Sequence, residues 1–215
     1  FEDQIIDIEP GDTHSACFGL AIDLGTTTIG VLLLDLTTGT TLDYAVFPNP
    51  QSSFGSDLIS RISYASQSSE NTLKLMNTVR QALVEVIEQL CIQHQISPSN
   101  IYLTVIAGNT VMTHLFWGVS PQYVGVFPFK PVFSSMLKQF NLFLDQGKLN
   151  LPMVISFPLI GGFVGGDIVS DMLAAELTNG QENVLLIDIG TNCEVVLKHD
   201  GQLFATSAPA GPALE

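Results

Sequence analysis

Hydrophobic residues along the chain fall into short runs of strand length and into longer segments with helical spacing. The apolar runs within residues 20–46 are separated by short polar turns, and they predict three successive β-strands. The segments 57–67 and 70–95 instead repeat apolar residues every three or four positions, which is typical of helices buried on one face. Pro98 then predicts a helix stop. This part of the chain indicates a β-meander followed by two helices.

Strands and helices alternate in the next part of the chain. The predicted elements are a strand at 101–108, a short helix at 109–118 with Asn109 as its N-cap, a strand at 153–160 and a helix at 164–177. Residues 118–150 are rich in proline and phenylalanine, fit no regular place in this order, and are interpreted as an insertion. The whole order predicts a mixed α/β domain.

A sequence repeat links two distant parts of the chain. The stretch LAIDLGTTTIGVLLLDLTTGTTLDYAV from Leu20 recurs in outline as LLIDIGTNCEVVLKHDGQLFATS from Leu185. In both copies an apolar strand ends in Asp-x-Gly-Thr, a second strand follows, and a third strand returns after a turn. The chain is therefore expected to contain two similar β-meanders.

Each copy carries an aspartate where its first strand meets the turn. A carboxylate in an apolar setting is costly unless a cation or hydrogen-bond donors meet it, so Asp23 and Asp188 should face something polar. The glycine permits a tight turn whose N–H groups can bind an anion, and threonine hydroxyls add neutral donors. The carboxylates suit Mg²⁺, directly or through water, because Mg²⁺ prefers oxygen ligands and bridges phosphates. One copy alone reads as an ordinary hairpin turn, but the duplication favours nucleotide-phosphate binding.

Composition limits the choice of ligand. The chain of 215 residues is 46% hydrophobic, yet no apolar run reaches the roughly 18 residues that a membrane span needs. Its 7 basic and 21 acidic residues give a net charge of −14, which disfavours nucleic acid and anionic membranes as partners.

The three cysteines are far apart in the sequence, so no disulfide framework, zinc knuckle or iron–sulfur cluster is expected within this chain. We therefore expect the protein to be in a reducing compartment, the cytoplasm.

Further candidates lie between the two repeats. In GGFVGGDIVSDML, Gly165 and Gly166 allow close backbone approach, and Asp167 could either cap the helix or orient water or magnesium in a cleft. Asn109 could touch phosphate, although helix capping is the simpler account. Arg61 is interpreted as part of a solvated helix face, and His114 as a core histidine.

Two Asp-x-Gly-Thr hairpins in this element order resemble the phosphate-1 and phosphate-2 motifs of the superfamily that contains acetate and sugar kinases, heat-shock chaperone ATPases and actin. Within it, the chain resembles the ATPase domain of the reductive activators of corrinoid proteins. The segments that carry the resemblance are DLGTTT, NPQSSFGSDLISRI, GNTVMTHLFWGVSP, GGFVGGDIVSDML, LLIDIGTNCEVVL and AGPALE, in that order over residues 19–215. This ordered set is far more specific than a single Asp-x-Gly-Thr.

The resemblance implies a ribonuclease-H-like, actin-type ATPase fold with one complete half and the opening β-hairpins of a second. We expect residues 1–18 to be a linker or the end of a preceding region, 19–180 to form the first half with its insertion at 118–150, and 181–215 to begin a truncated second half. The implied phosphate-binding residues are Gly25, Thr26, Thr27, Thr28, Asn109, Gly165, Gly166, Gly190, Thr191 and Asn192, and the implied catalytic residues are Asp23, Asp167 and Asp188, with Asp23 and Asp188 as magnesium ligands.

The implied activity is ATP hydrolysis, with ATP or ADP and Mg²⁺ in the cleft, coupled to reduction of a cobalt(II) corrinoid protein to cobalt(I). An iron–sulfur cluster is expected only in a domain outside this chain, and a homodimer is one assembly considered for the full-length protein. We expect the full-length protein to be the enzyme and this chain alone to be inactive. A small-molecule kinase of the same superfamily and a non-catalytic, actin-like nucleotide-binding module remain as alternatives.

Overall fold

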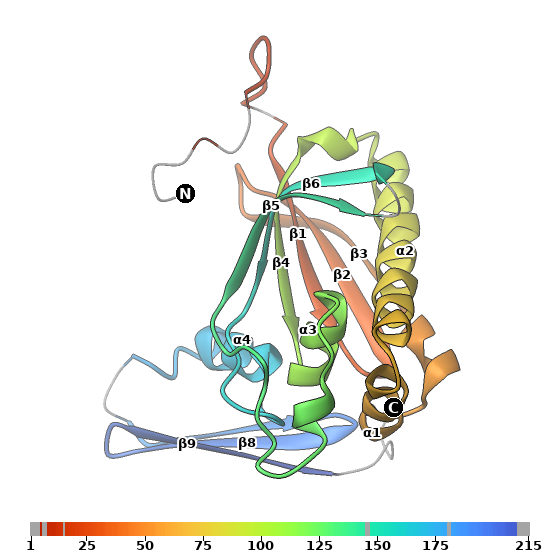
Figure 1. Cartoon of the computed structure of the whole chain (residues 1–215). Coiled ribbons are helices and arrows are strands. Elements are labelled where there is room, and N and C mark those ends of the chain that lie inside the picture. Colours follow the sequence, from red (N-terminus) through yellow and green to blue (C-terminus); the bar gives the residue numbers. More distant parts are fainter. Residues whose placement is uncertain (1–4, 6–7, 15, 145–146, 180–181, 210–215) are drawn as a thin grey trace.

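Nine strands form two sheets in the computed structural model, which describes residues 5, 8–14, 16–144, 147–179 and 182–209. The larger sheet has the order β3-β2-β1-β4-β6-β5 (Figure 1). Its strands are β1 (Phe18–Leu24), β2 (Thr28–Asp35), β3 (Thr40–Pro48), β4 (Ile101–Gly108), β5 (Leu137–Leu144) and β6 (Leu149–Ser156). Strands β1, β4 and β6 are parallel to one another, and the other neighbouring pairs are antiparallel.

Helices connect these strands and cover the sheet. The α-helices of the described residues are α1 (Leu58–Ser66), α2 (Ser69–His94), α3 (Thr110–Phe116) and α4 (Gly166–Ala174), and the 3-10 helices are η1 (Pro50–Phe54), η2 (Pro98–Asn100) and η3 (Gln122–Val124). Capping residues set their starts: the side chains of Asp57, Ser68 and Asn109 accept hydrogen bonds from backbone N–H groups in the first turns of α1, α2 and α3. Within this described part of the chain, none of the helices has the length and apolar character needed to cross a membrane.

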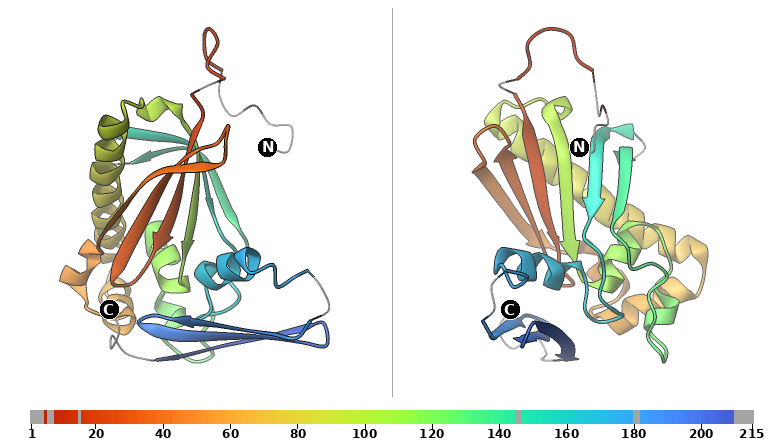
Figure 2. Two further views of the ribbon diagram at one scale, coloured as in Figure 1. Left: turned by 180° about the vertical axis from the view of Figure 1, so that it is seen from behind. Right: turned by 90° about the vertical axis from the view of Figure 1, so that its left-hand side faces the viewer.

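The core lies between α2 and one face of the larger sheet. Helix α2 crosses that face from β3 towards β5 (Figure 2). Leu75, Val79, Leu83 and Ile87 recur at helical spacing and are fully buried. They join one cluster with alternate residues of β1 and β2, since successive side chains of a strand point to opposite faces.

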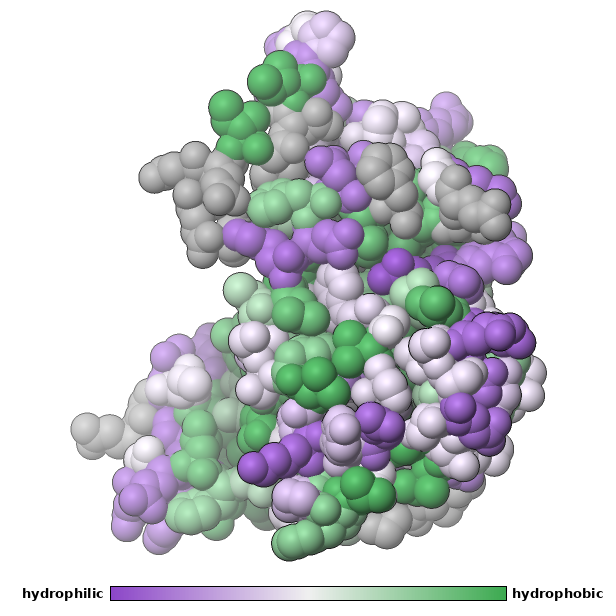
Figure 3. All heavy atoms as spheres, viewed as in Figure 1, coloured by the Kyte–Doolittle hydropathy of each residue, from purple (hydrophilic) through white to green (hydrophobic). Residues whose placement is uncertain are grey.

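The smaller sheet consists of β7 (Val184–Ile189), β8 (Asn192–His199) and β9 (Gln202–Pro209), paired antiparallel in that order. It lies across the ends of β1 and β4, beside α4 (Figure 1). One face packs against Ile168 and Leu177 through Val196. The other face exposes Leu185, Ile187 and Phe204, and hydrophobic residues are visible in this lower region of the molecular surface (Figure 3).

The structure confirms the predicted fold class. A three-stranded meander followed by alternating helices and parallel strands is the order of a ribonuclease-H-like half, and β7–β9 is the opening of a second copy. The predicted helix at 70–95, the strand at 101–108 and the Asn109 cap are also confirmed. The segment AGPALE at 210–215 lies outside the described residues, and the boundaries proposed at 18/19 and 180/181 stay predictions.

Two expectations were wrong. Residues 137–144, within the predicted insertion, form the edge strand β5. The strand predicted at 153–160 is β6, which spans Leu149–Ser156 and so also begins within the predicted insertion. Arg61, taken as solvated, is fully buried, because η1 and α3 close over it. Its Nε donates to the Gly55 carbonyl at 2.9 Å, and one terminal nitrogen donates to Met112 Sδ at 3.2 Å.

Candidate functional site

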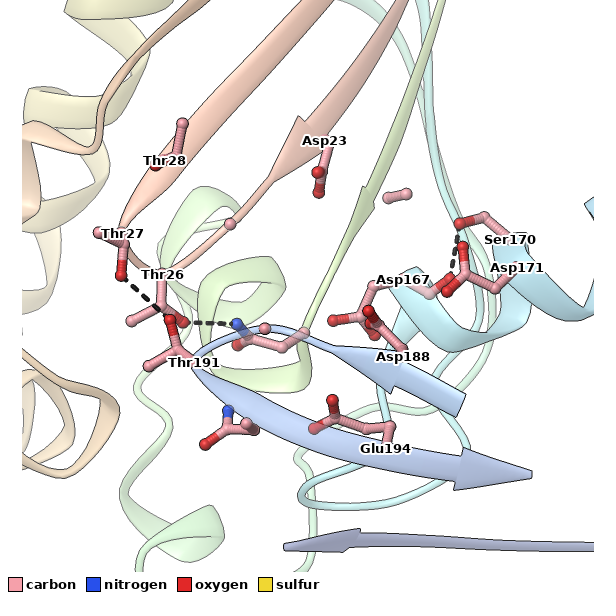
Figure 4. Close-up of a pocket in the computed structure, with 15 residues that line it drawn as sticks. Asp23, Thr26, Thr27, Thr28, Asp167, Ser170, Asp171, Asp188, Thr191 and Glu194 are labelled. Carbon is pink, nitrogen blue, oxygen red and sulfur yellow. Dashed lines mark hydrogen bonds between the residues drawn. The ribbon is translucent and has the colours of Figure 1, made fainter. Parts of the chain in front are cut away.

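A cavity of about 410 Å³ lies where the carboxyl ends of β1 and β4 face the smaller sheet (Figure 4). Its lining comes from both Asp-x-Gly-Thr hairpins, from the start of α3 and from α4. The described lining residues are Asp23, Gly25, Thr26, Thr27, Thr28, Ala107, Asn109, Asp167, Ser170, Asp171, Asp188, Gly190, Thr191, Asn192 and Glu194. None of them is a lysine or an arginine, so any anion bound here must be held by neutral donors or through a cation.

Strand alternation places Asp23 in this cavity. Leu20, Ile22 and Leu24 point into the core, and Asp23, between the last two, therefore points to the opposite face. Its neighbours across the sheet are Gly30 on β2 and Ala107 on β4. These small residues leave space in front of the carboxylate, which explains how an aspartate is accommodated inside a strand.

The first Asp-x-Gly-Thr turn is tight and is held by side chains. A Cβ on Gly25 would lie 2.3 Å from the Thr28 carbonyl oxygen, so only glycine fits this close approach. Asn109 caps α3 through its Oδ1, and its Nδ2 donates to Thr26 Oγ1 at 2.9 Å. Asn109 thus fills both roles considered for it, helix cap and cavity residue.

The second turn mirrors the first across the cavity. Asp188 is the second-to-last residue of β7, and Gly190 and Thr191 form the turn into β8, which begins at Asn192. The two hairpins touch, since Thr27 Oγ1, on the residue after the first Asp-x-Gly-Thr, and Thr191 Oγ1, of the second, lie 3.1 Å apart (Figure 4). Glu194 lies opposite Asp188 on the neighbouring strand, and its Oε1 accepts a hydrogen bond from Ser207 Oγ at 2.7 Å.

Helix α4 brings a third carboxylate into the cavity. Gly165 is its N-cap and packs against α3, because a Cβ there would lie 2.5 Å from Asn109 Cα. Asp167, in the first turn of α4, accepts a hydrogen bond from the Ile168 N–H at 2.8 Å. Asp171 follows one helical turn later, on the same side of the helix.

Burial raises the pKa of every carboxyl group in the cavity, and repulsion between the carboxylates adds to the increase for all of them except Asp188. Burial raises the pKa of Asp167 to about 7, although the Ile168 N–H opposes this shift. Burial likewise raises the pKa of Asp23, and the charges of Asp188 and Asp171 add to the increase. For Asp171, Asp188 and Glu194 burial is again the main cause of a raised pKa. A cation among these groups would relieve the repulsion.

The donor set fits Mg²⁺ that is bound together with phosphate. In the described ranges, no three histidine, cysteine, aspartate or glutamate side chains form a cluster that could hold a metal ion by themselves. Mg²⁺ normally uses one or two carboxylates, several waters and substrate phosphates instead of a complete protein cage. Asp23 and Asp188, which line one cavity together with two glycine-containing turns, match that pattern.

The structure brings together most of the residues that the sequence indicated. Gly165 and Gly166 are the exceptions: they pack against Asn109 and Phe157 and do not line the cavity. Sequence reasoning missed Ser170, Asp171 and Glu194. The available signals were the four-residue spacing from Asp167 to Asp171 and the position of Glu194 opposite Asp188 in a hairpin.

Comparison with known proteins agrees with this geometry. A family model described as "RACo middle region" matches residues 18–180, and one described as "C-terminal domain of RACo the ASKHA domain" matches residues 182–215. The corrinoid activation enzyme RamQ of Eubacterium limosum is 36% identical over 218 residues, which covers 99% of this chain and 36% of RamQ. The Co(II) methylated amine-specific corrinoid protein reductase of Methanosarcina barkeri is 25% identical over 221 residues, which covers 92% of this chain and 37% of the reductase.

A solved structure shows the same similarity in three dimensions. The structure described as a reductive activator for corrinoid, iron-sulfur protein has a TM-score of 0.88 and 38% identity to this chain, covering 95% of this chain and 33% of its own. The chain thus spans about a third of the length of these relatives. The resemblance to the reductive activators of corrinoid proteins is confirmed, and the chain belongs to the RACo family, with residues 18–180 matching its middle region.

Proposed function

We propose that this chain is the nucleotide-binding part of an enzyme that couples ATP hydrolysis to reduction of a cobalt(II) corrinoid protein. The observation that carries the proposal is the pairing of two Asp-x-Gly-Thr turns around one cavity, with Thr27 and Thr191 in contact. The names of the relatives, a corrinoid activation enzyme and a corrinoid protein reductase, supply the partner.

The two turns are assigned to the phosphates of ATP. Backbone N–H groups and threonine hydroxyls of residues 25–28 and 190–192 would donate to phosphate oxygens, while Asn109 fixes the Thr26 hydroxyl. Asp23 and Asp188 would hold Mg²⁺, directly or through water, and the ion would neutralise phosphate charge. The adenosine would contact parts of the protein outside this chain.

Asp167 is assigned as the general base. A base works best when its pKa is near the working pH, and burial raises the pKa of Asp167 to about 7. In the proposed step a water oxygen attacks the γ-phosphorus, the bond to the β–γ bridging oxygen breaks, and the water proton passes to the Asp167 carboxylate. The products are ADP and inorganic phosphate.

The redox half of the reaction lies outside this chain. Cobalt(II) gains one electron to become cobalt(I), and the electron comes from a low-potential donor, which we assign to an iron–sulfur cluster in another domain of the full-length protein. Hydrolysis at the cavity would supply the free energy for this unfavourable transfer. The homodimer stays a prediction.

The test uses the full-length protein with a cobalt(II) corrinoid protein, a low-potential reductant, ATP and Mg²⁺. Cobalt(I) formation is followed by its visible absorbance while phosphate release is measured. We expect cobalt(I) only with ATP, and faster hydrolysis when the corrinoid protein is present. Phosphoryl transfer to a small acceptor would instead identify a kinase, and tight ATP binding without turnover would indicate a structural module.

A further inference from the structure

Asn49 binds the first Asp-x-Gly-Thr turn (residues 23–28), although Asn49 does not itself line the cavity. It is fully buried and caps η1, with Oδ1 accepting the Gln51 N–H at 3.0 Å. Its Nδ2 donates to the Gly25 carbonyl at 2.9 Å, and its backbone N–H donates to the Thr27 carbonyl at 2.7 Å. One residue therefore holds two of the carbonyl groups in the turn.

These two hydrogen bonds decide which way the peptide units of the turn face. In a planar trans peptide the C=O and the N–H point in opposite directions. The Gly25 carbonyl belongs to the same peptide unit as the Thr26 N–H, and the Thr27 carbonyl to the same unit as the Thr28 N–H. With both carbonyls fixed on Asn49, both N–H groups face away from it, and Thr26 and Thr28 both line the cavity.

Asn49 is itself fixed by buried groups. Gln51 Nε2 donates to the Leu75 carbonyl of α2 at 3.0 Å, which anchors η1 to the core helix. Met112 Sδ lies 3.6 Å from Asn49 Nδ2 and 3.2 Å from the donating nitrogen of Arg61. Arg61 is fully buried, and its Nε donates a hydrogen bond to the carbonyl of Gly55, the C-cap of η1.

The turn is therefore supported on two sides by amide side chains. Asn109 holds the Thr26 hydroxyl from α3, and the Met112 N–H donates to Asn109 Oδ1 at 3.0 Å. Met112 thus links the two asparagines, because its backbone binds one and its sulfur lies beside the other. Such a preorganised support keeps donors aimed before the anion arrives.

We propose that Asn49 is a positioning residue that orients the Thr26 and Thr28 N–H groups towards the bound anion. The identity of that anion as a nucleotide phosphate rests on the proposed function, whereas the ordering of the turn does not.

The test compares three variants of the full-length protein. Asn49→Asp keeps the oxygen that caps η1 and removes the donor to Gly25, and Asn49→Ser does the same without adding a charge. Thr72→Val is the control, because it removes a buried side-chain donor that binds the Ala65 carbonyl of α1 and not the turn. Amide hydrogen exchange of residues 24–28 is measured without nucleotide, and ATP affinity is measured by calorimetry with Mg²⁺.

We expect both Asn49 variants to speed exchange in residues 24–28 and to weaken ATP binding by roughly tenfold, the usual effect of losing one buried hydrogen bond. Thr72→Val should lower the melting temperature without either effect. The inference would be overturned if Thr72→Val changed exchange in residues 24–28 and ATP affinity as much as an Asn49 variant with the same melting temperature. If the wild type binds no ATP, the proposed function fails, and the exchange comparison still decides the role of Asn49.

Discussion

Replacing Asp167 by asparagine should stabilise the folded protein at alkaline pH. Asp167 has its pKa raised from 3.8 to about 7 by burial, a difference of about 3 units. At about 1.4 kcal/mol per unit, the ionised form costs up to about 4 kcal/mol of folding free energy. Asparagine keeps the oxygen that accepts the Ile168 N–H and carries no charge, so it should remove this cost.

The sign of the pH dependence follows from the two protonation states. Between the unfolded pKa near 3.8 and the folded pKa near 7, the native state holds a proton that the unfolded state has released. The wild type therefore loses stability as the pH rises towards about 7, whereas the asparagine of the variant does not titrate. The stability advantage of Asp167→Asn should be near zero at pH 4, grow up to pH 7 and stay constant above it.

The assay is urea unfolding of wild type and variant across this pH range, with EDTA and without nucleotide. Glu85→Gln, on the exposed side of α2, is the control and should leave the pH dependence unchanged. ATP hydrolysis by Asp167→Asn should fall by roughly 10²- to 10⁴-fold if Asp167 is the general base. A variant that is less stable than the wild type at pH 8.5, or a stability difference that does not vary with pH, would refute the reasoning.

Other predictions concern the turns and the core. Gly25→Ala would place a methyl group 2.3 Å from the Thr28 carbonyl oxygen and should lower ATP turnover by roughly 100-fold. Gly161→Ala is the control, because the added Cβ would meet no neighbouring atom within 4 Å. Equal losses of turnover in the two variants would count against this packing argument. Asp188→Asn should weaken Mg²⁺-dependent ATP binding, measured by calorimetry, by roughly tenfold or more, and an unchanged affinity would remove Asp188 from the metal site. Leu83→Ala, at a fully buried position, should cost about 2–5 kcal/mol in urea unfolding, and a loss below about 1 kcal/mol would contradict its place in the core.

Local patterns were enough to predict the elements that build the site. The cost of a carboxylate within an apolar strand indicated that Asp23 faces something polar. The repeat of Asp-x-Gly-Thr then paired it with Asp188, although the two are far apart in sequence. The long apolar stripe of α2 predicted its buried face. The strand, turn and helix patterns depend on residues close together along the chain, and the pairing of the two turns depends on a motif that recurs, so the sequence carries both directly.

Features that depend on packing between elements were not predictable in the same way. Arg61 is buried because η1 and α3 enclose it, and helical spacing on α1 alone cannot show that. Glu194 reaches the cavity only once β8 pairs with β7. Strand β5 was not predicted because Asn141, which has a left-handed φ of 51°, interrupts the strand-like pattern of the sequence. Asn141 lies between Phe140, which pairs with Met153, and Leu142, which pairs with Leu151.

The central claim is that this acidic cavity holds nucleotide phosphates through a divalent cation. The most direct test is the affinity of the full-length protein for ATP, measured by calorimetry in Mg²⁺ and again in EDTA, for the wild type and for Asp23→Asn. We predict tight binding by the wild type only with Mg²⁺, and a much smaller dependence on Mg²⁺ in the variant. Equal wild-type affinity in Mg²⁺ and EDTA, or binding unaffected by the loss of the Asp23 charge, would contradict the account.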